Sequence, residues 1–303
     1  MTAHNKYLII TLVCCGLGIF TFSALKFYNT KSTKEIQLKD ERELKVSLEA
    51  GYGNLYISKG NPGSVVSAEM EADKKIDLDN CIDYRVRDHV GFLNMSLDCD
   101  QSGKMESKHH GKSIHFDNLD SRDWHVEFTN AVPTAYDIEL GLGRGDIDMT
   151  DLRVKDFSLS TGASSVKLKF GTPNKETIED MNLEAGVSKF TAEGLCNARF
   201  HHLKFEGGVG SYTLDFKGTL DREVDADIDV GLGTLTVIIP DNIGAKIIYE
   251  KSWIAHLDLA SSFEESGNEE NTYYSSNYDR ASGKINMRID AGMGSVKIRR
   301  SEW

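Results

Sequence analysis

The chain repeats one short phrase seven times, and this repetition restricts its fold more than any other feature. The phrase has the form apolar-x-x-Gly-x-(Gly/Ser)-x-apolar-x-apolar, with an extra residue in one copy. The copies are LEAGYGNLYI from Leu48, IELGLGRGDIDM from Ile138, LSTGASSVKL from Leu159, LEAGVSKFTA from Leu183, FEGGVGSYTL from Phe205, IDVGLGTLTV from Ile228 and IDAGMGSVKI from Ile289. First glycines of five consecutive copies are 21, 24, 22 and 23 residues apart. This period is typical of solenoids, in which each repeat buries its apolar face only against its neighbours.

Within each copy the apolar residues alternate, as in Val166-Lys-Leu168, which is strand periodicity. A second apolar stretch follows a turn, so we predict an all-β fold: a parallel β-solenoid with coils of about 22 residues, each with two strands and two bends. Glycine turns a tight corner most easily and lets coils approach closely. The predicted turn glycines are Gly51, Gly53, Gly141, Gly143, Gly162, Gly186, Gly208, Gly210, Gly231, Gly233, Gly292 and Gly294.

The repeat also divides the chain. Residues 64–130 lack the phrase and alternate like ordinary antiparallel strands. We therefore expect an anchor or signal segment at 1–28, a polar linker at 29–45, a β region at 46–130 and the solenoid at 131–303. The acidic stretch 261–271 is expected to be a mobile excursion. Solenoid ends need caps, for which the N-terminal strands and Trp303, near the last coil, are available.

The N-terminus has the length and composition of a membrane helix. Residues 7–25 carry no charge over 19 residues, and at about 1.5 Å per residue they span a hydrocarbon core. The segment is either an uncleaved signal anchor or a signal peptide cut near Ala24, and its length favours the anchor. Lysines stand on both sides, so the positive-inside rule leaves the orientation open. One long domain behind an early anchor favours export to the periplasm or cell exterior.

Composition narrows the classes of partner. The formal net charge is −12 at pH 7, and no basic run with interleaved aromatics occurs. We therefore expect no nucleic-acid partner. A dinucleotide loop needs G-x-G-x-x-G before a helix, whereas GLGTLT lacks the third glycine and precedes a strand. We expect no nucleotide and no other cofactor.

The cysteines allow one disulfide. Cys81 and Cys99 flank two strand-like runs, and a hairpin that turns at 88–91 would bring the two cysteines near each other. An oxidising compartment would then allow a disulfide between them. Two free cysteines remain the alternative. Cys14 and Cys15 lie in the apolar segment, and Cys196 has no evident partner.

Two further motifs carry little weight. Most histidines lie in or beside a polar segment, where solvent exposure is enough to explain their presence. The other two are adjacent on one strand and must point to opposite faces of the sheet. We therefore predict no metal site. These histidines are His109, His110, His115, His125, His201 and His202. Arg144-Gly-Asp146 spells a tripeptide of integrin-binding adhesins, but at a coil corner rich in glycine we attribute it to chance.

Acidic residues recur at one fixed place in the phrase. Two residues before the first glycine the copies carry Glu49, Glu139, Ser160, Glu184, Glu206, Asp229 and Asp290. Stacked coils would align them as a ladder, and like charges opposite each other in a sheet are destabilising. Water and cations such as Lys204 and Arg288 are one way to offset this cost. The sharper hypothesis is that the ladder, with Glu139, Glu184, Glu206, Asp229 and Asp290, binds divalent cations or a basic partner.

Three stretches together resemble a known family. They are Trp124–Pro133 leading to IELGLGRGDIDM, the serial G-x-(G/S) repeat, and the closing Tyr278–Ile298. Over residues 46–300 the chain resembles the toastrack family, adhesin-like β-solenoid domains of bacterial envelope proteins. The last stretch is similar to the C-terminal end of the cell-wall-active antibiotic response proteins. The resemblance implies a non-enzymatic envelope protein, linked in some members to membrane-stress signalling, and supplies neither catalytic residues nor a ligand.

Two classes of function follow. The first is a non-catalytic, membrane-anchored module for interaction, scaffolding, adhesion or stress sensing, with a protein partner or a second copy of itself. The second is a carbohydrate-active enzyme, because β-solenoids can present carboxylates on an outer face. Its candidate residues are Asp146, Asp148 and Asp151, or Asp225, Asp227 and Asp229. Aspartates on a flat, open sheet favour the first class, and a cleft with exposed aromatics favours the second.

Overall fold

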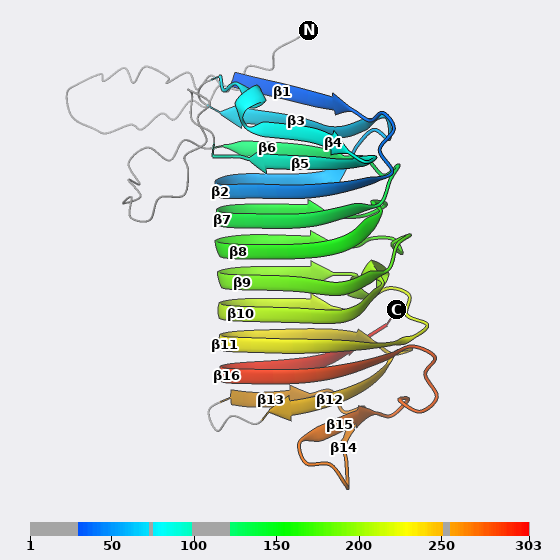
Figure 1. The fold of residues 1–303 in the computed structure, drawn as a ribbon. Helices are drawn as coiled ribbons and strands as arrows, with labels where there is room; N and C mark the ends of the chain where they lie inside the picture. Colours follow the sequence, from blue (N-terminus) through cyan, green and yellow to red (C-terminus); the bar gives the residue numbers. More distant parts are fainter. Residues whose placement is uncertain (1–29, 73–74, 99–121, 251–254, 303) are drawn as a thin grey trace, which may run out of the picture.

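The computed structural model describes residues 30–72, 75–98, 122–250 and 255–302. Its strands form one mixed sheet of sixteen, so the predicted all-β class is confirmed (Figure 1). No helix within the described ranges has the length and apolar character that crossing a membrane requires. The expected anchor at 7–25 lies outside the described residues, as do Cys14, Cys15, Cys99, His109, His110, His115 and Trp303.

The strands vary from 3 to 18 residues. In chain order they are β1 (Thr30–Gln37), β2 (Glu43–Lys59), β3 (Ser64–Ala72), β4 (Ile82–Arg87), β5 (Val90–Ser96), β6 (Asp123–Phe128), β7 (Thr134–Asp148), β8 (Val154–Lys169), β9 (Ile178–Glu193), β10 (Phe200–Asp215), β11 (Glu223–Pro240), β12 (Gly244–Glu250), β13 (Ala255–Leu259), β14 (Phe263–Glu265), β15 (Thr272–Ser275) and β16 (Lys284–Ser301). Two short 3-10 helices, η1 (Leu78–Asn80) and η3 (Leu195–Ala198), join them.

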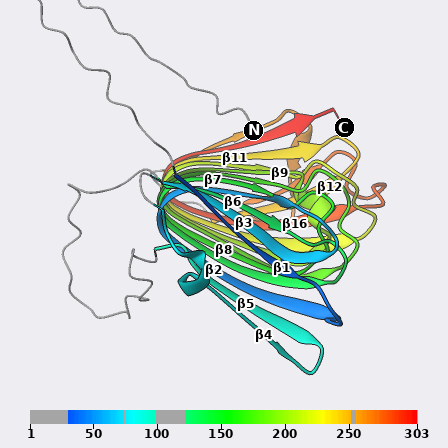
Figure 2. The same cartoon turned by 90° about the horizontal axis from the view of Figure 1, so that it is seen from above.

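Each copy of the repeated phrase forms one long strand, and the seven strands pair in parallel in the order β2, β7, β8, β9, β10, β11, β16. Every strand bends at its glycines and continues, so two arms lie on either side of the core (Figure 2). We predicted two separate strands per coil. Pairing instead resumes one residue beyond the bend, as in Ala50↔Leu140 followed by Tyr52↔Leu142, so the strand is continuous.

The core fills the space between the two arms. On β10, Leu203 and Phe205 come from one arm and Tyr212 and Leu214 from the other, and all four are fully buried. Phe205 packs edge-on against Tyr212, with ring centroids 5.4 Å apart. The alternation of apolar residues therefore does place one face of each arm inside, as strand geometry requires.

Close approach between layers explains the second glycine of the phrase. A Cβ at Gly143 would lie 1.9 Å from the carbonyl oxygen of Gly53, and one at Gly233 would lie 1.9 Å from that of Gly210. The φ angles of Gly143 and Gly233 are +132° and +140°, values that residues with a side chain rarely adopt. We call this side of the stack the glycine edge.

The opposite side of the stack, the loop edge, is held by buried carboxamides. Asn174 donates from Nδ2 to the carbonyls of Val154 (2.6 Å) and Ala198 (3.2 Å) and accepts at Oδ1 from the Val154 N–H (3.0 Å). Asn197 donates to the carbonyl of Phe170 (3.0 Å). Each carboxamide therefore satisfies backbone groups that irregular loops leave without a sheet partner.

Strand order departs from chain order at both ends of the sheet: β6 lies between β3 and β2 at one end, and β16 departs from chain order at the other. β16 lies between β11 and β12, so the copy at Gly292 is not the last layer, which corrects our expectation. β12 pairs with the first arm of β16 and β13 with the second, so these two strands supply a further layer. The stretch 261–271 contains β14, which pairs with β15 in a short hairpin at this end.

Antiparallel strands close the other end, as predicted. β1 pairs with β3 and β3 with β6, while β4 and β5 form a hairpin that turns at Asp88 and His89, both with positive φ. Cys81 is disulfide-bonded. Cys99 lies outside the described residues, so the pairing of Cys81 with Cys99 stays a prediction. Cys196 is a buried free cysteine.

Candidate functional site

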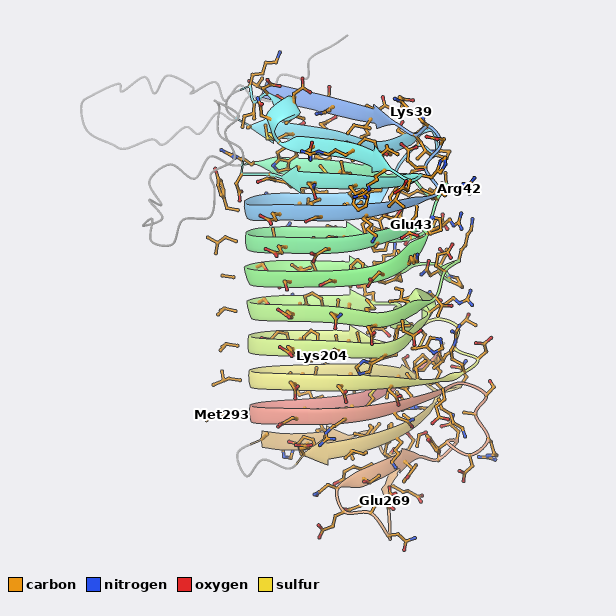
Figure 3. The ribbon with its side chains drawn as sticks, viewed as in Figure 1. Lys39, Arg42, Glu43, Lys204, Glu269 and Met293 are labelled. Carbon is orange, nitrogen blue, oxygen red and sulfur yellow. The ribbon has the colours of Figure 1, made fainter. Side chains whose placement is uncertain are left out.

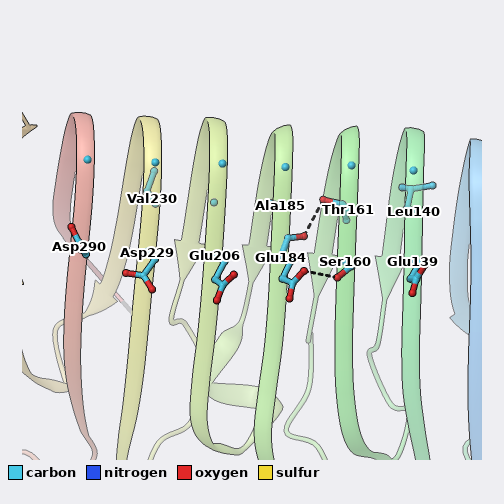
Figure 4. Close-up of a pocket in the computed structure, with 17 residues that line it drawn as sticks. Glu139, Leu140, Ser160, Thr161, Glu184, Ala185, Glu206, Asp229, Val230 and Asp290 are labelled. Carbon is cyan, nitrogen blue, oxygen red and sulfur yellow. Dashed lines mark hydrogen bonds between the residues drawn. The ribbon is translucent and has the colours of Figure 1, made fainter. Parts of the chain in front are cut away.

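The acidic residues of the repeat do lie in register on successive strands. We call Glu139, Glu184, Glu206, Asp229 and Asp290 the acidic ladder. Ser160 pairs with Glu139 on one side and Glu184 on the other, and the row continues as Glu184↔Glu206↔Asp229↔Asp290. Figure 4 shows these side chains side by side on one face. The predicted alignment therefore follows from the shared position in each phrase.

The row of carboxylates continues beyond the five residues of the acidic ladder at both ends. At one end Glu49 pairs with Glu139, and at the other Glu250 of β12 pairs with Asp290. Glu250 was not expected in this row, because residues 244–259 lack the glycine phrase. The only available signal was the apolar alternation of Ala245, Ile247 and Tyr249.

A groove follows the ladder along the stack. It has a volume of about 860 Å³ and is lined by the five carboxylates, Ser160 and the first glycines of the phrases. Buried residues such as Leu140, Ala185 and Val230 lie between a carboxylate and its glycine and also line the groove. Each of the six strands along the groove contributes its first glycine to the lining, and glycine has no side chain to obstruct the groove at the bend.

An apolar row borders the groove at the bend itself. We call Leu142, Ala163, Val187, Val209, Leu232 and Met293 the apolar ridge; each stands one residue after the first glycine of its phrase. Val187 is 63% exposed, and Val209, Leu232 and Met293 are 44–46% exposed. The ridge side chains are in register, and Met293 projects from the glycine edge in a column of side chains (Figure 3). The sequence pattern marks only the glycines at this bend as turn residues.

Local partners neutralise the ladder only in part. Lys204 Nζ lies 2.5 Å from Glu206, and Ser160 Oγ donates to Glu184 Oε2 at 3.0 Å. Arg288, expected to relieve the ladder, bonds to Glu250 at its end. Burial raises the pKa of Asp229, and so do the neighbouring carboxylates Asp290 and Glu206. Part of this rise therefore comes from neighbouring negative charge that the local cations leave uncompensated.

The ladder is a row and not a cage. Neighbouring strands are about 4.8 Å apart, whereas calcium takes six to eight oxygens at roughly 2.3–2.6 Å. Across the part of the chain that the structure describes, no group of three or more His, Cys, Asp or Glu could hold a metal ion. The arrangement is therefore suited to several separate positive charges.

Of the six aspartates considered for catalysis, Asp229 alone lines the groove. Burial opposes ionisation of Asp148, but hydrogen bonds from Thr150 and Lys169 outweigh it and lower its pKa. Bonds from Lys59 and Thr172 lower the pKa of Asp151.

In the second group, Asp225 contacts Asn286 Nδ2 at 3.2 Å and Asp227 contacts His202 Nε2 at 3.0 Å. The hollow beside Asp225 and Asp227 is lined by those two aspartates with His202, Ile248, Asn286, Met287 and Arg288, and none of these is an exposed aromatic.

The remaining predicted residues are spread over the surface. His125 stacks on Tyr56 with ring centroids 4.6 Å apart, and His201 is exposed on β10. Arg144 and Asp146 are exposed on β7, on the arm beyond the bend. They flank the buried Gly145 and do not join the groove.

Two family models together match most of the chain. Residues 26–193 match the model described as the N-terminal domain of toast_rack, DUF2154. Residues 196–298 match the model of cell wall-active antibiotics response LiaF, C-terminal. Since the first match covers more than half of the sequence, this chain belongs to the toast_rack family. The two models meet near residue 194, whereas one sheet runs across that point, and our own domain boundaries stay a prediction.

Solved structures with similarity include two from bacteria. The "putative cell adhesion protein" of Clostridium sporogenes ATCC 15579 is 21% identical, with 90% of this chain and 100% of that chain covered and a TM-score of 0.44. The "putative adhesin (BF0245)" of Bacteroides fragilis NCTC 9343 is 16% identical, with 89% and 97% covered and a TM-score of 0.36. No curated protein matches the sequence. The assignment therefore rests on the two family models.

Proposed function

We propose that this chain is a non-catalytic protein of the bacterial envelope whose acidic groove binds a basic protein partner. Residues 7–25 would anchor it, and the β-solenoid they precede would stand outside the membrane. The LiaF-like match supports a link to the envelope stress response. The bonded Cys81 supports an oxidising compartment for the sheet.

The observation that carries the proposal is the register of the acidic ladder along an open groove. Five carboxylates repeat on consecutive strands from β7 to β16, with one serine among them. Like charges directly opposite each other destabilise a sheet, and Asp290 and Glu206 add to the effect of burial in raising the pKa of Asp229. A partner with a row of Lys or Arg would remove the repulsion on binding. Binding and relief of strain are thus coupled at the same side chains.

A protein partner fits this row better than a metal ion or a nucleic acid. The carboxylates do not converge on one point, which a metal ion requires. Negative charge along the groove repels a phosphate backbone. Basic side chains on one partner can meet several carboxylates at once, and such multivalent contacts add up along the row.

Photocrosslinking in native membranes tests the proposal. A photoreactive residue replaces the exposed Ala163 on the ridge, in the wild type and in the ladder variant Glu184→Gln/Glu206→Gln/Asp229→Asn. We expect a specific crosslinked protein in the wild type and its loss in the ladder variant. The matched control Glu264→Gln/Glu265→Gln/Glu270→Gln removes three exposed charges at the far end of the stack and should keep the crosslink. An equal yield in the ladder variant would overturn the proposal.

A further inference from the structure

The acidic ladder and the apolar ridge run side by side along the glycine edge from β7 to β16. On each strand the ridge residue stands three positions after the ladder residue, as in Glu184 and Val187 or Asp229 and Leu232. The groove lies over the first glycines, which stand between the ladder residue and the ridge residue in each phrase. A ligand lying along the stack would therefore meet negative charge on one flank and apolar side chains on the other.

The spacing of both rows identifies the shape of that ligand. Each row advances by one strand separation, about 4.8 Å per layer. Successive turns of an α-helix advance by about 5.4 Å, a mismatch of roughly 0.6 Å per layer. Same-face residues of an extended peptide are about 6.8 Å apart, a mismatch of roughly 2 Å. In a helix that lies along the stack, each turn thus corresponds to about one layer and presents about one residue to it.

We propose that the groove binds a cationic amphipathic α-helix lying along the stack, with its apolar face on the ridge and its Lys and Arg face on the ladder. The five layer steps from Glu139 to Asp290 span about 24 Å, which corresponds to roughly 16 helical residues. This inference specifies the structure of the basic partner and therefore rests on the proposed function. Salt-bridged Lys204 does not block it, because an exposed ion pair is weak and a bound cation can replace it.

The negative charge beside the apolar ridge argues against a membrane as the ligand of this surface. A membrane-binding apolar strip is bordered by Lys and Arg, which attract anionic lipid. The ridge is bordered instead by carboxylates, and the glycine groove separates the two rows. A basic helix satisfies both the charged and the apolar row, whereas an anionic bilayer satisfies only the second.

Binding of designed peptides to the full chain in phosphatidylcholine nanodiscs tests the inference. One labelled 18-residue peptide segregates its Leu and Lys residues on opposite helix faces, and a second has the same composition in scrambled order. Signal from empty nanodiscs is subtracted. We expect the segregated peptide to bind at least about tenfold tighter than the scrambled one, because only it contacts both rows at once.

Three variants separate the contributions of the two rows. The ladder variant should bind the segregated peptide at least about tenfold more weakly and lose most of the salt dependence. The ridge variant Val187→Thr/Val209→Thr/Leu232→Thr, which keeps strand-forming side chains, should weaken binding severalfold and retain the salt dependence. The far-end control Glu264→Gln/Glu265→Gln/Glu270→Gln should bind like the wild type.

The outcomes distinguish the two proposals. Equal binding of both peptides to the wild type, with loss in the ladder variant, overturns the helix and leaves the basic partner in place. Undiminished binding in the ladder variant overturns both. A photoreactive residue moved along the segregated peptide should crosslink with a period of about 3.6 residues, and a flat profile would also overturn the helix.

Discussion

The two edges of the stack hold successive layers together in different ways. At the glycine edge, backbone meets backbone, and Gly233 lies so close to Gly210 that a Cβ would be 1.9 Å from its carbonyl oxygen. At the loop edge, layers are joined by side chains such as Asn174, which bonds to Val154 and Ala198. The first edge permits one arrangement only, and the second accommodates loops of different length.

This difference explains where variation and function are found. Repeat lengths range from 21 to 24 residues, yet the ladder and the ridge stay in register. The loop edge must therefore absorb the extra residues. A surface with a fixed repeat can present evenly spaced charges to a partner, which irregular loops cannot do.

The largest effect is expected at the glycine edge. Gly233→Ala places a methyl group against the Gly210 carbonyl at a φ of +140°, and should lower the free energy of unfolding by roughly 3 kcal/mol or more. Urea denaturation measures the loss. Gly267→Ala is the matched control, because nothing lies within 4 Å of its Cβ position. Equal stability of the two variants would show that the close approach is not required.

At the loop edge the expected loss is somewhat smaller. Asn174→Ala leaves the backbone groups of Val154 buried without their partners, which costs about 2–3 kcal/mol. Asn268→Ala, at an exposed position, should change stability by less than about 0.5 kcal/mol. If Asn174→Ala unfolds at the same urea concentration as wild type, the carboxamide does not hold this edge.

Relieving the acidic ladder should stabilise the protein slightly. The pKa of Asp229 is raised in the folded state, so ionisation disfavours folding, and the penalty is complete above the folded pKa and absent below the unfolded value near 3.9. Asp229→Asn should add about 0.5 kcal/mol at pH 7, and the gain should vanish near pH 3.

For Asp258 the expected change in stability has the opposite sign. Its hydrogen bond with Arg299 lowers its pKa, so Asp258→Asn should destabilise at pH 7. The two substitutions are compared by thermal unfolding across pH. Destabilisation by Asp229→Asn at neutral pH would contradict a strained ladder.

The smallest effect is expected on the apolar ridge. Val187 is 63% exposed, and Val187→Thr retains a β-branched side chain, so stability should stay within about 0.5 kcal/mol of wild type. Circular dichroism during thermal unfolding measures this. A loss above about 1 kcal/mol would mean that Val187 serves folding and not binding.

Features of the fold that follow from equal positions in the repeated phrase could be predicted from the sequence, whereas the spatial order of the strands could not. Alignment on the glycines placed Glu184 beside Glu206 and Asp229, because in-register stacking converts equal positions in a phrase into neighbours in space. It did not place β16 between β11 and β12, because periodicity reports similarity and not spatial order.

Two parts of the candidate site were missed for related physical reasons. Glu250 joins the row through an insertion without the phrase. The apolar ridge was visible as residues such as Val209 between two glycines. Their exposure depended on how sharply the backbone bends, which the pattern alone does not report.

Thermal unfolding of the full chain in nanodiscs, with and without a short oligolysine, tests the ladder most directly. We predict that oligolysine raises the melting temperature of the wild type and of the far-end control, but not that of Glu184→Gln/Glu206→Gln/Asp229→Asn. Calcium should give no rise that depends on these three carboxylates. An equal rise with oligolysine in all three proteins would show that the acidic ladder is not the binding face, and a ladder-dependent rise with calcium would identify a metal site in its place.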